Sequence, residues 1–405
     1  MDSGTIAWML TASALVLFMT PGLAFFYGGL VRARNVISTI MYSFIAMAVV
    51  SIVWVLWGYS LAFGDGFGDG RFIGDFSRLG LNGIDVQTGA DELMFVVFQM
   101  MFAIITPALI TGAIVERFKF TTYLVFLVLW ITLVYAPIAH WVWAGNGWIF
   151  DMGALDFAGG TVVHINAGAA ALVAAIMVGK RKNAASEPHN VPYVVLGASI
   201  LWFGWFGFNA GSGLVADGLA INAFLVTNTA AATAALTWGI ISQIQTGRMS
   251  AIGVASGAVA GLVAITPASG YVGVMGAIAI GFGAGVLCYG AVLLRTRLKF
   301  DDALEVVAVH GVGGLWGALA TGIFALAVIN PAGADGLIAG NAEQMLKQLA
   351  AIGATLGYSL VATAIILKVL DVIPGLGLRV SENEEDQGLD LSSHGERGYV
   401  SDGAD

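Results

Sequence analysis

The chain has 405 residues, of which 58% are hydrophobic and only 11% charged, with a mean hydropathy of +0.86. Soluble globular domains carry about a quarter charged residues, so this composition excludes an ordinary soluble domain and predicts an all-α polytopic membrane protein. The formal net charge of −9 argues against a nucleic-acid-binding protein. The single cysteine, Cys288, excludes an intramolecular disulfide and a metal site built from several cysteines.

Apolar stretches about twenty residues long recur along the chain, and each predicts a membrane-spanning helix. The first stretch follows Met1-Asp2 without a basic segment, which favours an uncleaved span over a removed signal peptide. The abundant glycine, 55 residues, is typical of helices that pack closely in lipid. We expect eleven spans within a transmembrane domain of residues 1–371, at 6–31, 36–63, 92–115, 121–140, 157–179, 191–211, 218–245, 250–267, 271–295, 303–328 and 347–371.

The connections between the expected spans alternate in charge. Every second connection is basic, with Arg32, Arg34, Arg117, Lys119, Lys180, Arg181, Lys182, Arg248, Arg295, Arg297 and Lys299. The intervening connections are mainly acidic, with Asp65, Asp69, Asp75, Asp85, Asp151, Asp217, Asp335 and Glu343. Because basic loops stay in the cytoplasm, this pattern predicts an outer N-terminus and a cytoplasmic C-terminus in the cytoplasmic membrane.

Two matching segments occupy corresponding places in the two halves of the chain. Asp156-Phe-Ala-Gly-Gly-Thr-Val-Val-His164 lies on the fifth expected span, and Asp302-Ala-Leu-Glu-Val-Val-Ala-Val-His310 lies on the tenth. Eight helical residues rise about 12 Å, which carries each His well into a hydrocarbon core about 30 Å thick. Two sets of five spans run in opposite directions. The pattern therefore predicts an inverted repeat, spans 1–5 and 6–10, around a central pore.

An ionisable side chain inside a membrane is expensive and indicates a functional site. A single such His can equally be a satisfied core residue, but a matched pair favours function. Nearby glycines permit the helices to approach closely, so that the imidazoles can meet: Gly160, Gly168, Gly313 and Gly314. Low dielectric favours neutral rings. Such a pair can share one hydrogen bond and still offer a donor and an acceptor to a small solute.

Histidines on separate helices are also compatible with haem ligation. The small residues around both histidines favour a slot over a pocket for a macrocycle. His140, His189 and His394 are expected near a span end, in a loop and in the tail, and no second His or Cys lies near His164 or His310. We therefore expect no metal site, and we also expect no cofactor and no enzyme activity.

Aromatic residues gather near the ends of three spans. Phe98 and Phe102 share one face of the third span, Trp143 follows the fourth, and residues 201–212 at the end of the sixth alternate aromatics with glycine before Ser212. An interfacial belt explains most of the tryptophans, but not this density in 201–212. A ring face binds a small cation by about 0.5–2 kcal/mol, and a hydroxyl can accept a hydrogen bond from it.

Asp156 and Asp302 open their spans, where an Asp is typical of a helix N-cap. A capping carboxylate is already hydrogen-bonded. We therefore expect Asp156 to act on a nearby cation indirectly.

The composition changes sharply near Val372. Residues 381–386 form a charge run, and residues 388–399 follow with Leu389, Leu391 and Tyr399. Residues 372–405 are expected to form a cytoplasmic tail that is either solvated and disordered or docked on the cytoplasmic face through these three side chains.

At these residues the chain resembles the ammonium transporter (Amt/Mep/Rh) family, most closely its bacterial and archaeal Amt branch. The resemblance covers nearly the whole chain. It is carried by Pro21-Gly-Leu-Ala-Phe-Phe-Tyr-Gly-Gly-Leu30, Ala136-Pro-Ile-Ala-His-Trp-Val-Trp143, Asp156–Gly168, Gly204-Trp-Phe-Gly-Phe-Asn-Ala-Gly-Ser212, Val309-His-Gly-Val-Gly-Gly314 and the Gly388–Tyr399 tail.

The resemblance implies an eleven-helix homotrimer with one pore per subunit. It implies that Trp143 and Ser212 form an outer ammonium site with Phe102 beneath it, that Phe102 and Phe208 are a stacked gate, that Asp156 supports the outer site, and that His164, His310 and Trp205 line the pore. The chain departs from the family pattern at Glu305, where many relatives have Asp, at Arg397, and in the spacing from Trp143 to Asp156.

The same resemblance implies ammonium and ammonia as substrates, methylammonium as an analogue, and a cytoplasmic PII-type protein as a regulator. A charge at mid-bilayer costs several kcal/mol, so we expect NH4+ to lose its proton and NH3 to pass. The proton then either returns outside or crosses separately over the two histidines, and the resemblance favours the second course. Two alternatives are an ammonium sensor that signals through its tail with little net flux, and a bis-His haem membrane redox protein.

Overall fold

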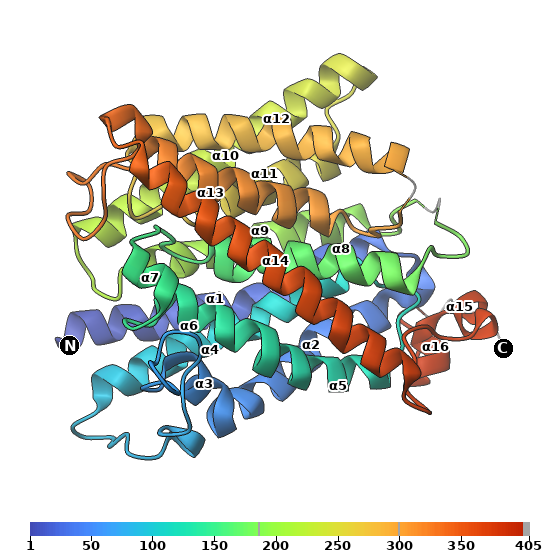
Figure 1. The fold of residues 1–405 in the computed structure, drawn as a ribbon. Coiled ribbons are helices and arrows are strands. Elements are labelled where there is room, and N and C mark those ends of the chain that lie inside the picture. Colours follow the sequence, from blue (N-terminus) through green and yellow to red (C-terminus); the bar gives the residue numbers. More distant parts are fainter. Residues whose placement is uncertain (185–186, 299, 400–405) are drawn as a thin grey trace.

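The computed structural model describes residues 1–184, 187–298 and 300–399, so Lys299 and residues 400–405 of the tail lie outside the described part. Figure 1 shows long helices that run between two ends of the molecule. The N-terminus lies at one end, called here the N-side, and the tail lies at the other, called the tail side. Within the described residues the only β-type pairing is a single bridge between Phe118 and Arg379.

The first half of the chain forms five membrane-crossing segments. They are α1 (Ser3–Leu30), α2 (Val36–Val53) continued by the π-helical η2 (Trp54–Gly58) and α3 (Tyr59–Phe63), α4 (Ala90–Thr111), α5 (Phe120–Trp130) continued by the π-helical η4 (Ile131–Tyr135) and α6 (Ala136–Trp143), and the π-helical η5 (Gly160–Ile165) continued by α8 (Asn166–Val178). Short elements lie between them: η1 (Ala33–Asn35), η3 (Leu79–Leu81) and α7 (Trp148–Met152).

The second half repeats this arrangement and adds one helix. It contains α9 (Val191–Gly211), α10 (Gly218–Thr246), α11 (Ala251–Ile265), α12 (Val274–Leu298), the π-helical η6 (Val307–Val312) continued by α13 (Gly313–Phe324), η7 (Leu337–Ala339) and α14 (Glu343–Val372). In the described residues ten helices are long and apolar enough to cross a membrane, and α11 is a shorter apolar helix of 15 residues. The expected span at 250–267, the eighth, is therefore α11, which ends shortly before Pro267 because proline cannot donate a helical hydrogen bond.

The inverted repeat is clearest at the first and last segments of each half. The opening helices α1 and α9 pack along one another, and both closing segments begin with a π-helix that contains a histidine. The second and fourth segments differ between the halves, because α10 and α12 lack the π turns of η2 and η4. The predicted all-α repeat architecture is confirmed in outline.

Glycine allows the two opening helices to touch backbone to backbone. A Cβ on Gly197 of α9 would lie 2.2 Å from the Phe26 nitrogen of α1, and one on Gly207 would lie 2.7 Å from the Ala12 oxygen. Such contact is the usual way in which helices gain van der Waals packing in lipid. It brings the two halves together along the central axis of the molecule.

The helix α14 belongs to neither half and crosses the bundle diagonally (Figure 1). It packs on α8, α13 and α5. Its N-terminal end lies beside the N-side loops, and its C-terminal end leads into the tail.

The described part of the tail is docked. Its short helices α15 (Glu382–Gln387) and α16 (Leu389–His394) lie against the tail-side loops. The Asp390 carboxylate accepts a hydrogen bond of 2.8 Å from the Ser38 nitrogen near the start of α2. Tyr399 lies 3.0 Å from the Nε2 atom of His189. Leu389 is buried, whereas Leu391 stays exposed.

Candidate functional site

Two carboxylates hold the starts of the histidine-bearing helices. Asp156 accepts hydrogen bonds from the nitrogens of Gly159, Gly160 and Thr161 at 2.8, 2.7 and 2.8 Å, and from the Thr161 hydroxyl. Asp302 accepts from the nitrogens of Val306 and Val307 at 3.1 and 2.7 Å. These N–H groups have no partner inside their helices. The capping function expected of both Asp residues is present, but the first helix begins at Gly160, four residues beyond Asp156.

Both histidines lie within π turns. In the first of these turns the His164 nitrogen donates to the Gly159 oxygen at 3.1 Å, a spacing of five residues. Such turns are rare and recur at functional sites. The 3.6-residue pattern of an apolar segment does not reveal such turns, so they could not be predicted from the sequence.

The structure brings His164 and His310 into direct contact. Their Nδ1 atoms lie 3.2 Å apart, and their ring centroids lie 5.3 Å apart with an angle of 28° between the planes. Glycine makes this approach possible, because a Cβ on Gly314 would lie 3.0 Å from the Cβ of His164. Both side chains are almost fully buried.

This contact fixes the hydrogen-bonding capacity of the pair. One Nδ1 must donate and the other must accept, since two protonated or two bare nitrogens would repel. Each neutral ring then has the opposite character at Nε2, so the pair presents one donor and one acceptor. The buried Nε2 of His164 has no hydrogen-bond partner among the described residues.

Two aromatic rings lie beside His164. Trp205 lies 5.5 Å from the His164 ring with an angle of 22° between the planes, and its indole Nε1 donates to the Thr266 hydroxyl at 2.8 Å. The centroid of the Phe208 ring lies 6.1 Å from that of the His164 ring and 4.2 Å from that of the Phe102 ring. The two Phe residues expected to form a gate are therefore in contact.

The remaining expected site residues continue this series toward the N-side. Trp143 is partly buried, and the centroid of its ring lies 5.8 Å from that of Phe102, with an angle of 90° between the planes. Its indole Nε1 donates a hydrogen bond of 3.0 Å to the backbone oxygen of Asp156. The Ser212 hydroxyl donates to the Phe208 oxygen at 2.8 Å. Ser212 is thus connected to these aromatic residues by its hydrogen bond to Phe208, and Asp156 is connected to them by the hydrogen bond that its backbone oxygen accepts from Trp143.

His310 lines two cavities of very different size. The first is a slot of about 10 Å³ that contains both histidines, Trp205 and Phe208, with a lining that is otherwise apolar. About 10–15 Å³ of such space holds one water-sized molecule. The second, of about 380 Å³, is a tail-side vestibule whose lining includes Tyr27, Arg295 and Glu305.

The slot does not fit a haem. Two imidazoles in hydrogen-bonding contact leave no space for a macrocycle between them, and the slot has room for only one small molecule. Among the described residues no three His, Cys, Asp or Glu side chains come close enough to bind a metal ion. The other histidines lie elsewhere: His140 is buried against the oxygens of Ala62 and Gly70, and His189 and His394 lie on the tail side.

Three residues contribute to this site without having been expected. Thr161 and Thr266 hold Asp156 and Trp205, and Gln348 of α14 contacts Leu155. Thr161 could have been found from its place next to the capped glycines. No sequence pattern connects Thr266 with Trp205 or Gln348 with Leu155, because the partners are 61 and 193 positions apart.

Residues 7–399 match the sequence model of a family described as the Ammonium Transporter Family. The chain belongs to the ammonium transporter family. It is 49% identical to the ammonium transporter of Bacillus subtilis over 98% of this chain and 99% of that one. The resemblance noted from the sequence motifs is thereby confirmed.

Solved structures of the family agree with the fold. Mep2 of Candida albicans is 38% identical, covers 98% of this chain and 91% of its own, and superposes with a TM-score of 0.89. A structure described as a sensor Amt protein is 31% identical over 96% of this chain and 98% of its own, with a TM-score of 0.87. Membership of the family makes ammonium transport the function of this chain.

Proposed function

We propose that this membrane protein binds NH4+ on its N-side, removes a proton, and conducts NH3 through the slot beside His164 and His310. The observation that carries the mechanism is the contact between two buried imidazoles in a slot of about 10 Å³, next to two phenylalanine rings in contact at an angle of 37°. An ion would have to leave its hydration shell there without any charged partner, which is costly. A neutral amine needs only the donor and the acceptor that the rings supply.

The recognition step belongs to Trp143, Phe102 and Ser212. The two aromatic rings are in contact at 90°, and the face of such a ring attracts a small cation. The Ser212 oxygen can accept one hydrogen bond from the cation while its own proton remains on the Phe208 oxygen. Asp156 acts through Trp143 and not as a ligand, because its carboxylate oxygens are occupied by backbone donors.

The proton travels separately from NH3, across the histidine pair. One Nε2 accepts a proton, the shared proton shifts across the Nδ1–Nδ1 contact of 3.2 Å, and the partner ring releases its own Nε2 proton on the far side. Charge is conserved, since one proton enters and one leaves. The shared proton then lies on the other Nδ1, so the rings must reorient before a second proton can cross in the same direction.

The decisive experiment measures charge movement in proteoliposomes on a solid-supported membrane after a jump in ammonium concentration. The wild-type protein should give a transient current that methylammonium reduces by competition. His164→Ala should lose the current, whereas Thr363→Val on α14, which removes the acceptor of a buried hydrogen bond from Trp130 on α5, should keep it. If the His164→Ala variant gave a current as large as that of the wild-type protein, the mechanism would be overturned.

A sensor with little net flux is the second candidate, and the similarity to a sensor Amt protein favours it. Uptake of labelled methylammonium separates the two functions. Sustained accumulation in vesicles indicates a transporter. Saturable binding without accumulation indicates a sensor.

The functional unit is a homotrimer in the cytoplasmic membrane. An apolar groove of about 830 Å³ between α1, α9 and α10 supports subunit contact on that side, and it includes Trp8, Phe206 and Phe224. The mass of the detergent-purified protein tests the assembly.

The N-side faces the exterior and the tail side faces the cytoplasm, where a PII-type protein closes the vestibule. The described basic residues that follow α1, α4, α8 and α10 support this orientation. Cysteines introduced singly at exposed Val86 and Ser393 test it with an impermeant thiol reagent, since Cys288 is buried. Co-purification with a PII-type protein, with and without residues 373–405, tests the partner.

A further inference from the structure

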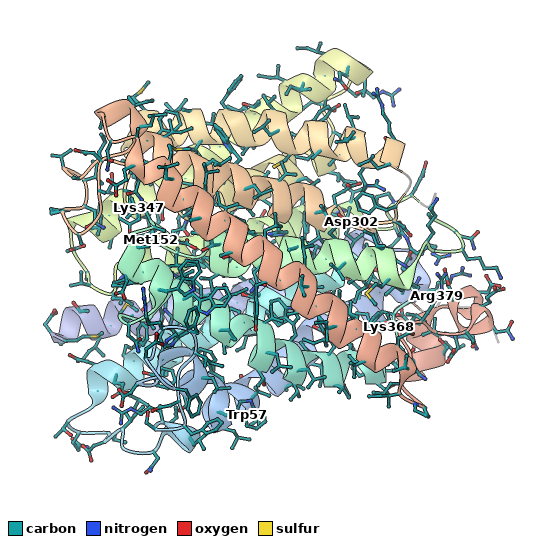
Figure 2. All side chains as sticks on the ribbon, in the orientation of Figure 1. Trp57, Met152, Asp302, Lys347, Lys368 and Arg379 are labelled. Atoms are coloured by element: carbon teal, nitrogen blue, oxygen red, sulfur yellow. The ribbon has the colours of Figure 1, made fainter. Side chains whose placement is uncertain are left out.

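The helix α14 makes a buried polar contact with the loop that precedes Asp156. Gln348 is 1% exposed, and its Oε1 atom accepts a hydrogen bond of 2.6 Å from the Leu155 nitrogen. Its Nε2 atom donates to the Leu155 oxygen at 2.9 Å and to the Ala318 oxygen at 3.0 Å. Figure 2 labels Met152, the last residue of α7 before this loop, close to Lys347 of α14 on the N-side.

The neighbouring Gln344 strengthens this contact. Its Nε2 atom donates to the Gly153 oxygen at 3.1 Å and to the Gln348 Oε1 atom at 3.2 Å. Every hydrogen-bonding position of the Gln348 amide is thus used, since its two protons reach two oxygens and its oxygen takes two donors. A side-chain amide that pairs with both the nitrogen and the oxygen of one residue fixes the orientation of that residue. Fully satisfied buried networks of this kind are rigid.

Leu155 passes this restraint on to the proposed recognition site. Asp156 is the next residue, and its backbone oxygen accepts the Trp143 indole N–H. The Asp156 carboxylate holds the nitrogens of Gly159, Gly160 and Thr161 at the start of the helix that contains His164. The chain of contacts therefore runs from Gln348 through Leu155 and Asp156 to both Trp143 and the His164 helix.

We infer that Gln348 is a positioning residue for ammonium recognition, because it sets the backbone orientation of Leu155 and, through Asp156, the placement of Trp143. This inference rests on the proposed function of Trp143. Gln348 does not contact the substrate in this arrangement. Through Gln348, the helix α14, which lies outside the inverted repeat, contributes to ammonium recognition.

A purely structural bond between α14 and the bundle is the competing explanation, and the variants separate the two. Q348M keeps a side chain of similar length and removes all four hydrogen bonds. Q348E keeps the shape and the acceptor but loses both amide donors. Thr363→Val is the matched control, since Thr363 is a buried residue of the same helix that accepts the Trp130 indole N–H at 3.0 Å, away from the loop.

The experiment measures transient current in proteoliposomes as a function of ammonium concentration. Losing a buried, fully used hydrogen-bond network costs about 1–3 kcal/mol, so Q348M should raise the half-saturating concentration about tenfold. Q348E should raise it by at least as much, because a carboxylate oxygen would face the Leu155 and Ala318 carbonyl oxygens without a donor between them. The maximal current should fall less than twofold in both variants, and Thr363→Val should leave the half-saturating concentration unchanged. A structural defect alone would lower the amount of active protein and the maximal current, without shifting half-saturation.

A double-mutant cycle with Trp143→Leu completes the test. If Gln348 acts through Trp143, adding Q348M to Trp143→Leu should shift half-saturation by much less than tenfold. An equal shift in both backgrounds, or no shift from Q348M in the wild-type background, overturns the inference while leaving the recognition site intact. If Trp143→Leu alone leaves half-saturation unchanged, the proposed recognition site fails and the inference fails with it.

Discussion

Gly168 and Gly311 lie in backbone contact, so that a Cβ on Gly168 would come within 2.3 Å of the Gly311 Cα atom. This contact lies one helical turn beyond His164 and directly after His310 along the chain. It sets the separation of the two helices at the point where the imidazoles meet. The short distance between the rings is therefore a property of the glycines as much as of the histidines.

Gly168→Ala should push these helices apart and impair transport. Overpacking of this kind costs about 1–3 kcal/mol, and the Nδ1–Nδ1 contact of 3.2 Å should lengthen. We expect at least a tenfold fall in ammonium-dependent current and a lower melting temperature in detergent. Gly353→Ala is the control, since a Cβ there meets no described atom within 4 Å. Wild-type current in Gly168→Ala would show that the helix separation is not critical.

Asp156→Asn tests the capping carboxylate. Both Asp156 oxygens accept N–H groups, and an amide in their place would turn an NH2 group toward donors that then lack a partner. Unsatisfied buried donors cost about 1–3 kcal/mol. We expect lower thermal stability together with lost transport.

Asp217→Asn provides the comparison for Asp156→Asn. Asp217 caps α10 with one hydrogen bond of 3.0 Å to the Ala220 nitrogen, and asparagine is also a good cap. This variant should retain wild-type stability and current. Equal losses in the two variants would argue against a special role for Asp156.

Thr266→Val tests the restraint on Trp205. The Thr266 hydroxyl accepts the indole N–H at 2.8 Å, and valine leaves that buried donor without this acceptor. Trp205 should then lose its fixed position over His164, with a fall in maximal current of about tenfold. Thr266→Ser retains the hydroxyl and should restore most of the current. If serine and valine give the same current, the hydrogen bond has no role in transport.

The tail-side acids predict a pH dependence of stability. Burial raises the pKa of Glu305 to about 7, although the Arg295 guanidinium opposes this shift. Burial likewise raises the pKa of Asp302 to about 6, against the opposing effect of the Val307 and Val306 N–H groups. A carboxyl whose pKa is higher in the folded than in the unfolded state stabilises the fold below its unfolded pKa of about 4, and this contribution is lost as the pH rises through the folded value.

Glu305→Gln should remove part of this dependence. Between about pH 5 and pH 8 the melting temperature of the wild-type protein should fall relative to that of Glu305→Gln, because glutamine resembles the protonated acid at every pH. Thermal unfolding across this range provides the measurement. Glu343→Gln, at an exposed acid on the N-side, should follow the wild-type curve. A difference between wild type and Glu305→Gln that does not vary with pH would contradict the prediction.

The histidine pair was predictable because its signal is local. A polar ring within an apolar span has a large energetic cost, and the shared eight-residue spacing from Asp156 and Asp302 marks both copies. The capping role of Asp156 was predictable for the same reason. The true start of that helix was not, because Gly159 adopts a positive φ of 120° and lets the carboxylate reach over a short loop.

Other features depend on contacts that no local pattern reports. Gln348 lies near the N-side end of an apolar helix, where a glutamine is typical of a residue at the membrane surface. Its buried partners become visible only when α14 lies across the bundle. α11 ends at Ile265, close to Pro267, which gives its short length a local cause. The span expected from hydropathy nevertheless ran on to residue 267.

The slot of about 10 Å³ has room for only one small molecule at a time. In the proposed mechanism a slot of this size has no room for a hydrated sodium or potassium ion. Throughput then depends on how quickly a lone occupant leaves for the wide vestibule of about 380 Å³. A cell could therefore insert many copies into its membrane without short-circuiting the ion gradients that power it.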